Sequence, residues 1–262
     1  MLFYPLFSGS SGNASLVEAG DVRILIDAGV AGCALTRALS EIDVDPKNVS
    51  AILITHEHRD HIHGAGIFSR KYDVPIYANR GTWEGMRPCV GNIAPRNVRV
   101  FETNRDFYIQ NVNITPFKTP HDALESVGYR IDFNGKSLAV MTDIGAAEPC
   151  LLDAVEGADL LMIEANHDVN MLKSGRYPYV LKRRILSDVG HLSNECAGRA
   201  LAKLYLKGLR HAILGHLSLD NNLEELALET VREILRAEDI SDANFELTVA
   251  HRDRLTGRYE VG

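Results

Sequence analysis

The chain has little cysteine, and its cysteines are not paired in sequence. Its 262 residues include four, Cys33, Cys89, Cys150 and Cys196, and no two of them form a C-x-x-C pair. This spacing argues against a disulfide framework and against a paired-thiol site. We therefore expect reduced and mostly buried thiols.

Long apolar runs are also absent. No stretch approaches the length of a membrane span, and the first five residues, Met1 to Pro5, lack a basic segment followed by an apolar core. We expect no membrane partner and no signal peptide, with the cytoplasm as the default location. No obligate protein partner is evident, and the oligomeric state is left open.

An excess of basic residues is missing too, because the formal net charge is −7. This argues against a broad basic footprint for nucleic acid, although whole-chain charge says little about one cleft. Bound divalent cations would offset local negative charge. The cations of Lys118, Arg176 and the run Lys182-Arg183-Arg184 could contact phosphates or could simply form a solvated face.

The composition is that of an ordinary globular protein, with 45% hydrophobic and 24% charged residues. Short apolar strands come in two sets, each followed by amphipathic helices such as 195–206 and 223–237. Asn134-Gly135 indicates a hairpin turn. Two sheets packed together with helices outside is the expected layer arrangement, and no linker or repeat divides the chain. We predict a single domain over residues 1–262.

The most informative stretch is Thr55-His-Glu-His-Arg-Asp-His61, which follows the apolar run 51–54. His56 and His58 are two positions apart, so they point the same way in extended backbone. Asp60 and His61 come where the chain must turn and could face a second ion. Imidazole and carboxylate are ligands that zinc, manganese and iron accept. The pattern predicts a metal site at a strand end.

Other residues of the same chemistry follow predicted strands. His121, Asp143 and His216 each come just after an apolar run, where a rigid backbone can position a ligand. Asp27 also ends a strand, and it could cap the following helix or hold a metal-bound imidazole from behind. The loop Ser8-Gly-Ser-Ser-Gly-Asn13 could line a cleft or be a plain connection.

This set of residues resembles the ligand set of the metallo-β-lactamase-fold hydrolases, over nearly the whole chain. The resemblance implies an α/β fold, an αββα sandwich of two mixed β-sheets with helices on the outer faces. It implies two divalent metal ions, zinc or manganese, with iron also compatible. One ion would take His56, His58 and His121, and the other Asp60, His61 and His216. Asp143 would bridge them, and Asp27 would support the site.

Within that superfamily the chain is most similar to the YycJ/WalJ-type group of nucleases. The motifs that carry this similarity are 8–13, Glu164-Ala-Asn-His-Asp168, Gly190-His-Leu-Ser193 and Gly215-His-Leu-Ser218 with Asn221-Asn222. The paired Gly-His-Leu-Ser motifs are also similar to those of tRNA 3′-processing nucleases of this fold. No β-CASP domain and no long RNA-gripping arm is evident.

The resemblance implies a dinuclear metal-dependent hydrolase, a phosphodiesterase or exonuclease acting on DNA or RNA through a metal-bound hydroxide. Asp60 could orient the hydroxide, and His191, which has no ligand position, could protonate the departing oxygen. Ser193 and Ser218 could bind phosphate oxygens or cap helices. His167 could be a further substrate-side histidine or could pack against the site.

Two other classes of function stay open. A thioesterase or lactonase of the same fold would act on a small molecule, and one fold hosts many substrates. His191 favours the nuclease, because a thiolate or lactone leaving group needs little acid catalysis. The third class is a metal-binding module without catalytic activity. Every ligand position holds a residue that can bind metal, so nothing in the sequence favours this class.

Overall fold

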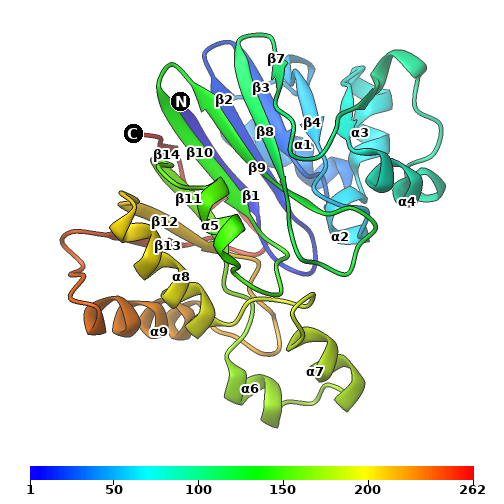
Figure 1. The fold of residues 1–262 in the computed structure, drawn as a ribbon. Helices are drawn as coiled ribbons and strands as arrows, with labels where there is room; N and C mark the ends of the chain where they lie inside the picture. Colours follow the sequence, from blue (N-terminus) through cyan, green and yellow to red (C-terminus); the bar gives the residue numbers. More distant parts are fainter.

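Two seven-stranded sheets pack face to face in the computed structural model, which describes residues 1–262 (Figure 1). The first sheet has the strand order β14-β1-β2-β3-β4-β5-β6. It is mixed, because β1, β2 and β3 pair antiparallel whereas β3 to β6 run parallel. Its strands are β1 (Leu2–Phe7), β2 (Ala14–Ala19), β3 (Val22–Ile26), β4 (Ala51–Leu53), β5 (Ile76–Ala78), β6 (Val98–Val100) and β14 (Tyr259–Glu260).

The second sheet has the order β13-β12-β11-β10-β9-β8-β7 and is also mixed. β7 to β10 pair antiparallel, and β10 to β13 run parallel. Its strands are β7 (Phe107–Ile109), β8 (Val112–Lys118), β9 (Val127–Phe133), β10 (Lys136–Met141), β11 (Leu160–Glu164), β12 (His211–Gly215) and β13 (Glu246–Val249). The predicted turn at Asn134-Gly135 joins β9 to β10, and both of its residues have the positive φ that a type I′ turn requires.

Helices cover the outer face of each sheet. The first sheet carries α1 (Gly32–Glu41), α3 (Ala65–Tyr72) and α4 (Arg80–Val90), and the second carries α5 (Pro149–Ala154), α8 (Asn194–Leu206) and α9 (Glu224–Ala237). Short elements complete the fold: α2 (Arg59–Ile62), α6 (Val169–Ser174), α7 (Tyr179–Ile185) and the 3₁₀ turns η1 (Pro46–Asn48) and η2 (Pro95–Asn97).

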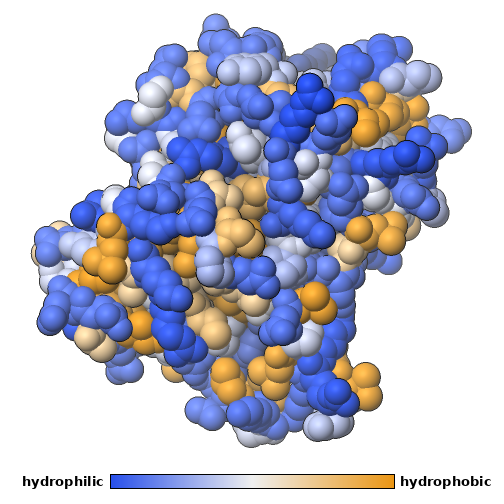
Figure 2. All heavy atoms as spheres, in the orientation of Figure 1, coloured by the Kyte–Doolittle hydropathy of each residue, from blue (hydrophilic) through white to orange (hydrophobic).

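Three apolar clusters hold these four layers together. One lies between the sheets and joins residues such as Val17 and Ile24 to Tyr129 and Leu138. The other two lie between each sheet and its own helices. This is the αββα arrangement that the sequence predicted, because a sheet buried on both faces needs a partner layer on each side. The face shown in Figure 2 is mostly hydrophilic.

The helices show where sequence patterns were insufficient. α4 was not predicted, because Gly81, Gly85 and Pro88 lie within it and such residues weaken a helical pattern. Its start is stabilised by the side chain of Asn79, which accepts a hydrogen bond from the backbone of Thr82 at 2.9 Å. The predicted turn at Asp60 and His61 is instead the four-residue helix α2.

The cysteines differ from the prediction in burial. All four are free, but Cys33, Cys89 and Cys150 are exposed and Cys196 is half-buried. The three exposed cysteines lie on helices whose buried faces are occupied by larger apolar side chains, such as Leu35, whereas Cys196 packs partly against the core. No helix of the structure has both the length and the apolar character that a membrane crossing requires.

Candidate metal centre

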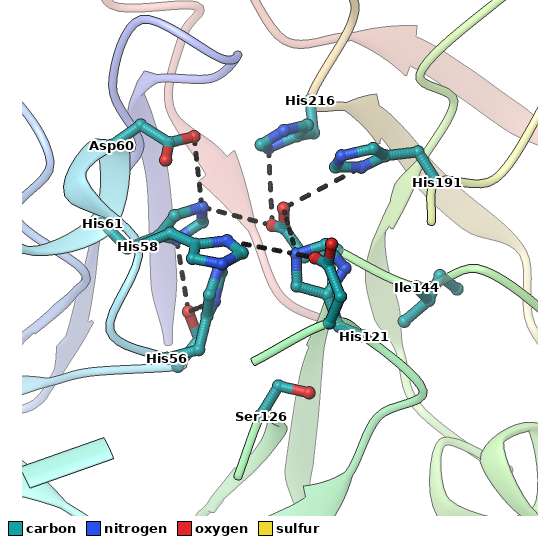
Figure 3. A network of polar contacts seen from close by, with 12 residues as sticks. His56, His58, Asp60, His61, His121, Ser126, Ile144, His191 and His216 are labelled. Atoms are coloured by element: carbon teal, nitrogen blue, oxygen red, sulfur yellow. Dashed lines mark hydrogen bonds and ion pairs between the residues drawn. The ribbon is translucent and has the colours of Figure 1, made fainter. Parts of the chain in front are cut away.

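Three imidazoles from two sheets meet at one end of the sandwich (Figure 3). His56 follows β4 of the first sheet, His58 precedes α2, and His121 follows β8 of the second sheet. The Nε2 atom of His121 lies 3.3 Å from Nδ1 of His58. One ring nitrogen from each residue fits within a group of atoms no more than 4.8 Å apart. This spacing suits a single shared cation.

The protonation of this trio also suits a cation. Burial lowers the pKa of His56 well below its ordinary value and lowers the pKa of His121, so both rings are neutral at neutral pH. His121 donates from Nδ1 to the carbonyl oxygen of Gly190 at 3.1 Å, which leaves its Nε2 as the acceptor. Nε2 of His56 is buried without a hydrogen-bond partner.

A second trio, Asp60, His61 and His216, lies beside the first. Helix α2 places Asp60 and His61 on one short turn, and His216 directly follows β12. Nε2 of His61 lies 3.5 Å from Oδ2 of Asp60. The three side chains offer ligand atoms within 4.8 Å of one another. The rings of His61 and His216 are stacked, with centroids 5.8 Å apart.

The carboxylate of Asp143 lies between the two trios. Its Oδ2 is 3.3 Å from Nε2 of His61 and 3.4 Å from Nδ1 of His216, and its Oδ1 is 3.8 Å from Nε2 of His121. Burial by itself would raise its pKa, but the rings of His216 and His61 hold the pKa well below the usual range. Asp143 is therefore an anionic carboxylate that faces both groups.

Asp27 stands behind His61, away from the cavity. Its Oδ2 accepts a hydrogen bond from Nδ1 of His61 at 2.8 Å, and Thr55 donates to the same carboxylate through its backbone and its hydroxyl. Helix α1 begins after Ala31 without any side-chain cap. Of the two roles weighed for Asp27, the structure therefore favours the orientation of an imidazole over helix capping.

The loop 8–13 belongs to the site. The hydroxyl of Ser8 accepts a hydrogen bond from the backbone of His216 at 2.8 Å. The side chain of Asn13 donates to the carbonyl of Asp60 at 3.3 Å, and its Oδ1 lies 3.2 Å from Nδ1 of His216. This loop therefore links the second trio across the two sheets. Nothing local in the sequence singled out Asn13 for this role.

The half-buried His191 and the buried Glu164 form a pair beside the centre. Nδ1 of His191 donates to Oε1 of Glu164 at 2.7 Å, and Oε2 accepts from the backbone of Ile144 at 2.8 Å and of Leu192 at 3.2 Å. Burial by itself would lower the pKa of His191, but the Glu164 carboxylate and, more weakly, Asp143 raise it to about 9. The ring therefore carries a proton at neutral pH.

Glu164 is a site residue that sequence reasoning did not assign. The available signal was a carboxylate at the end of the otherwise apolar strand β11, whose carboxyl end lies beside those of β10 and β12. Parallel neighbouring strands bring their carboxyl ends to one edge of the sheet. Glu164 is fully buried there, and a buried carboxylate requires partners.

The three residues weighed for substrate binding have different surroundings. The hydroxyl of Ser193 accepts from the backbone of Cys196 and caps α8. The hydroxyl of Ser218 accepts from the backbone and side chain of Asn221. His167 is buried, and neither of its ring nitrogens has a hydrogen-bond partner. Burial lowers the pKa of His167 to about 4, so it is neutral. It lines a cavity of about 380 Å³ together with His191 and Ser193.

The residues of the centre fit bound cations. Oδ2 of Asp143 and Nε2 of His56 are both buried without a hydrogen-bond partner. Buried polar atoms are nearly always satisfied, and these two residues belong to a group whose ligand atoms lie within 4.8 Å of one another, so both fit the role of cation ligands. The donors are imidazole and carboxylate alone, a set that suits zinc, manganese or iron.

Comparisons with known proteins agree with this geometry. The sequence model of the Beta-lactamase superfamily domain matches residues 22–217. The chain is 41% identical over 233 residues to exodeoxyribonuclease YycJ of Bacillus anthracis, which covers 89% of this chain and 88% of that protein. It is 41% identical over 237 residues to exodeoxyribonuclease WalJ of Streptococcus pneumoniae, with 90% and 88% covered.

Among solved structures, the metallo-β-lactamase fold protein YhfI of Bacillus subtilis superposes with a TM-score of 0.72 at 18% identity, covering 99% of this chain and 100% of that one. At this identity the likeness concerns the fold. Together with the sequence matches, it shows that the chain belongs to the metallo-β-lactamase superfamily of hydrolytic enzymes, in the family that includes YycJ and WalJ.

Proposed function

We propose that this protein is a dinuclear metal-dependent exonuclease that hydrolyses phosphodiester bonds of DNA. The observation that carries the proposal is the position of His191 beside the candidate metal centre, where its Nδ1 donates to the buried Glu164 at 2.7 Å and leaves Nε2 to give a proton. An alkoxide leaving group needs a proton, whereas an activated thiolate does not. The names of the 41% identical relatives, both exodeoxyribonucleases, support DNA as the substrate.

The ligand groups favour two cations. His56, His58 and His121 would hold one, and Asp60, His61 and His216 the other, with Asp143 facing both. We propose zinc or manganese for both positions, from the donor types. Such cations would supply an activated water near neutral pH and would neutralise charge at phosphorus.

Asp60, His191 and Glu164 have separate roles in the proposed hydrolysis. Asp60 is the only half-buried carboxylate among the proposed ligands, and its partial exposure supports the proposal that it would orient the attacking water. His191 donates a proton from Nε2 to the departing oxygen, because its Nδ1 is committed to Glu164. Glu164 keeps the ring charged and aligned, a role common for carboxylates paired with catalytic histidines.

The test uses the variant His191→Ala. We expect it to retain its metal content by elemental analysis and to cleave 5′-labelled oligonucleotides at least about tenfold more slowly. His191 also offers a ligand atom to a group with Asp143, Glu164 and His216, so loss of metal would show that the ring helps to hold a cation and would overturn its role as proton donor. An unchanged rate would remove His191 from the mechanism.

The same protein preparation decides between substrate classes. Metal-loaded wild-type protein is incubated in parallel with single-stranded and double-stranded DNA, with RNA and with a thioester. Hydrolysis of the thioester without any cleavage of nucleic acid would overturn the proposed function and would favour the thioesterase alternative of this fold.

A further inference from the structure

A basic lobe lies beside the metal centre and is not explained by it. Residues 169–187 contain five lysines and arginines and no aspartate or glutamate, in a chain with a net charge of −7. These residues form α6 and α7, which Figure 1 shows beyond the end of the two sheets. A concentrated positive segment in an acidic protein is an electrostatic footprint for an anionic partner.

Two of the five cations are committed to holding the lobe in place. Nζ of Lys182 donates to the carbonyl oxygens of Lys173 and Gly175, both at 2.7 Å, and so joins α7 to the end of α6. Arg184 makes a two-pronged ion pair with Asp122, the neighbour of His121. The lobe is therefore braced against the loop that carries a proposed metal ligand.

The other three cations form no ion pair within the protein. Lys173, Arg176 and Arg183 are exposed and form no ion pair. Tyr179 and Val180 are also exposed, at 74% and 79%, and the guanidinium of Arg183 lies 6.0 Å from the centre of the Tyr179 ring. Figure 2 shows apolar groups among hydrophilic ones on this part of the surface. An exposed aromatic ring among free cations is the composition of surfaces that stack bases and bind phosphates.

The lobe is also within reach of the reaction. The backbone of His191 donates to the carbonyl of Ile185, the last residue of α7, at 3.0 Å. Because a helix rises roughly 1.5 Å per residue, Tyr179 lies about 10 Å further along α7. That distance corresponds to a few nucleotides of a strand whose scissile phosphate lies at the centre.

We propose that Tyr179, Arg176 and Arg183 form a binding surface for single-stranded nucleic acid that leads the strand to the metal centre. This proposal rests on the proposed function and specifies where its substrate is held. A lipid surface would also suit basic and apolar groups, but the bracing of the lobe against the His121 loop and the contact to His191 favour the substrate of this site.

The experiment compares two substrates on the metal-loaded full-length enzyme. A single-stranded oligonucleotide reaches the lobe, whereas bis(p-nitrophenyl) phosphate engages the metal centre alone. For Arg176→Glu/Arg183→Glu and for Tyr179→Ala, we expect kcat/KM on the oligonucleotide to fall by about tenfold or more. Hydrolysis of the small ester should stay within about twofold, and Tyr179→Phe should restore oligonucleotide activity, because it retains the ring.

The matched control is Arg87→Glu/Lys203→Glu, which makes the same change of net charge at exposed positions on α4 and α8. It should leave the oligonucleotide kcat/KM near that of the wild type. The dependence of log K on log salt for a single strand should become shallower by about 1.4 in the lobe double variant, since each lost phosphate contact accounts for about 0.7.

Binding of a phosphorothioate single strand, measured by fluorescence anisotropy, separates this proposal from the proposed function. Weaker binding by the lobe variants supports the binding surface even if no DNA is cleaved. Equal binding by the wild type and the lobe variants overturns the surface while leaving the nuclease intact. Co-sedimentation with phosphatidylserine vesicles that is lost only in the lobe variants, with unchanged strand binding, would assign the surface to lipid and also overturn the proposal.

Discussion

Three residues at the candidate metal centre adopt left-handed backbone conformations within two residues of a strand end. Asp27, Asp143 and His216 have φ values of 60°, 55° and 55°. Non-glycine residues pay about 1–3 kcal/mol for sparsely populated conformations, and aspartate and histidine tolerate this one better than most. The turn redirects Asp143 and His216 from the strand ends toward the shared cavity, and it sets the Asp27 carboxylate behind His61.

The pair of His191 and Glu164 leads to a prediction of non-additivity. Glu164→Gln keeps a group of the same shape but removes the charge that raises the pKa of His191, so we expect slower cleavage with full metal content. In the double variant Glu164→Gln/His191→Ala, the rate should equal that of His191→Ala, because Glu164 acts through the ring. If the fold reductions in cleavage rate of the two single variants multiply in the double variant, measured in single-turnover assays, Glu164 acts independently of His191.

His61 leads to a prediction for the pH dependence of metal binding. Burial by itself would lower its pKa, but Asp143, Asp27 and Asp60 hold the pKa well above the ordinary value in the metal-free protein. A proton therefore competes with the cation at neutral pH, and zinc affinity should rise as pH increases from about 6 to 8. Calorimetry in buffers of different ionisation enthalpy should detect net proton release. A pH-independent affinity would contradict this assignment.

At the scale of elements, helix α2 depends on a close backbone approach. A Cβ at Gly29 would lie 1.6 Å from the carbonyl oxygen of Asp60, so only glycine permits α2 to lie against the start of the β3–α1 connection. The same contact area includes the hydrogen bond from the backbone of Asn13 to the carbonyl of Asp60, at 2.8 Å. Backbone packing thus sets the position of Asp60 and His61.

We therefore expect Gly29→Ala to displace α2, to lower the free energy of unfolding by about 1–3 kcal/mol or more, and to weaken metal binding. Urea denaturation and a zinc-indicator competition assay measure the two effects. Gly257→Ala is the matched control, because a Cβ there would make only an ordinary contact with Tyr259 at 3.8 Å. Wild-type metal affinity in Gly29→Ala would show that α2 tolerates the shift.

At the scale of the whole molecule, the candidate metal centre draws its residues from both sheets. His56, His58, Asp60 and His61 follow β4 of the first sheet, whereas His121, Asp143 and His216 follow β8, β10 and β12 of the second. Cations shared between these groups would hold the ends of the sheets together. They would bind the folded chain and not the unfolded one, and such ligands raise stability by mass action.

Chelation should therefore lower the melting temperature. A ligand present at about a thousand times its Kd contributes about 4 kcal/mol, which for a chain of this size corresponds to a change of about 10 °C. Scanning calorimetry with and without EDTA measures it. Asp143→Asn removes the shared carboxylate charge, so its melting temperature should differ much less with and without EDTA. A difference as large as that of the wild type would show that the stabilising cations bind elsewhere.

Local sequence patterns predicted much of this molecule. Most strands, the hairpin at Asn134-Gly135 and most long helices depend on neighbouring residues, whose periodicity can be read directly, whereas the short strands β7 and β14 were not predicted. The ligand candidates were predicted because each follows an apolar strand. Helix α4 was missed because its glycines and proline are tolerated only through packing against the first sheet, and Glu164 because its partner His191 is distant in sequence.

The sequence by itself determined the two-sheet architecture and the chemical types of the site, because apolar periodicity and residue identity are local properties. Only the tertiary structure decided which side chains meet. It assigned Asp27 to His61, recruited Ser8 and Asn13 to the second trio, paired Glu164 with His191, and placed the basic lobe against the His121 loop. These contacts join residues far apart in the chain, so their distances depend on how the sheets pack and on no local pattern.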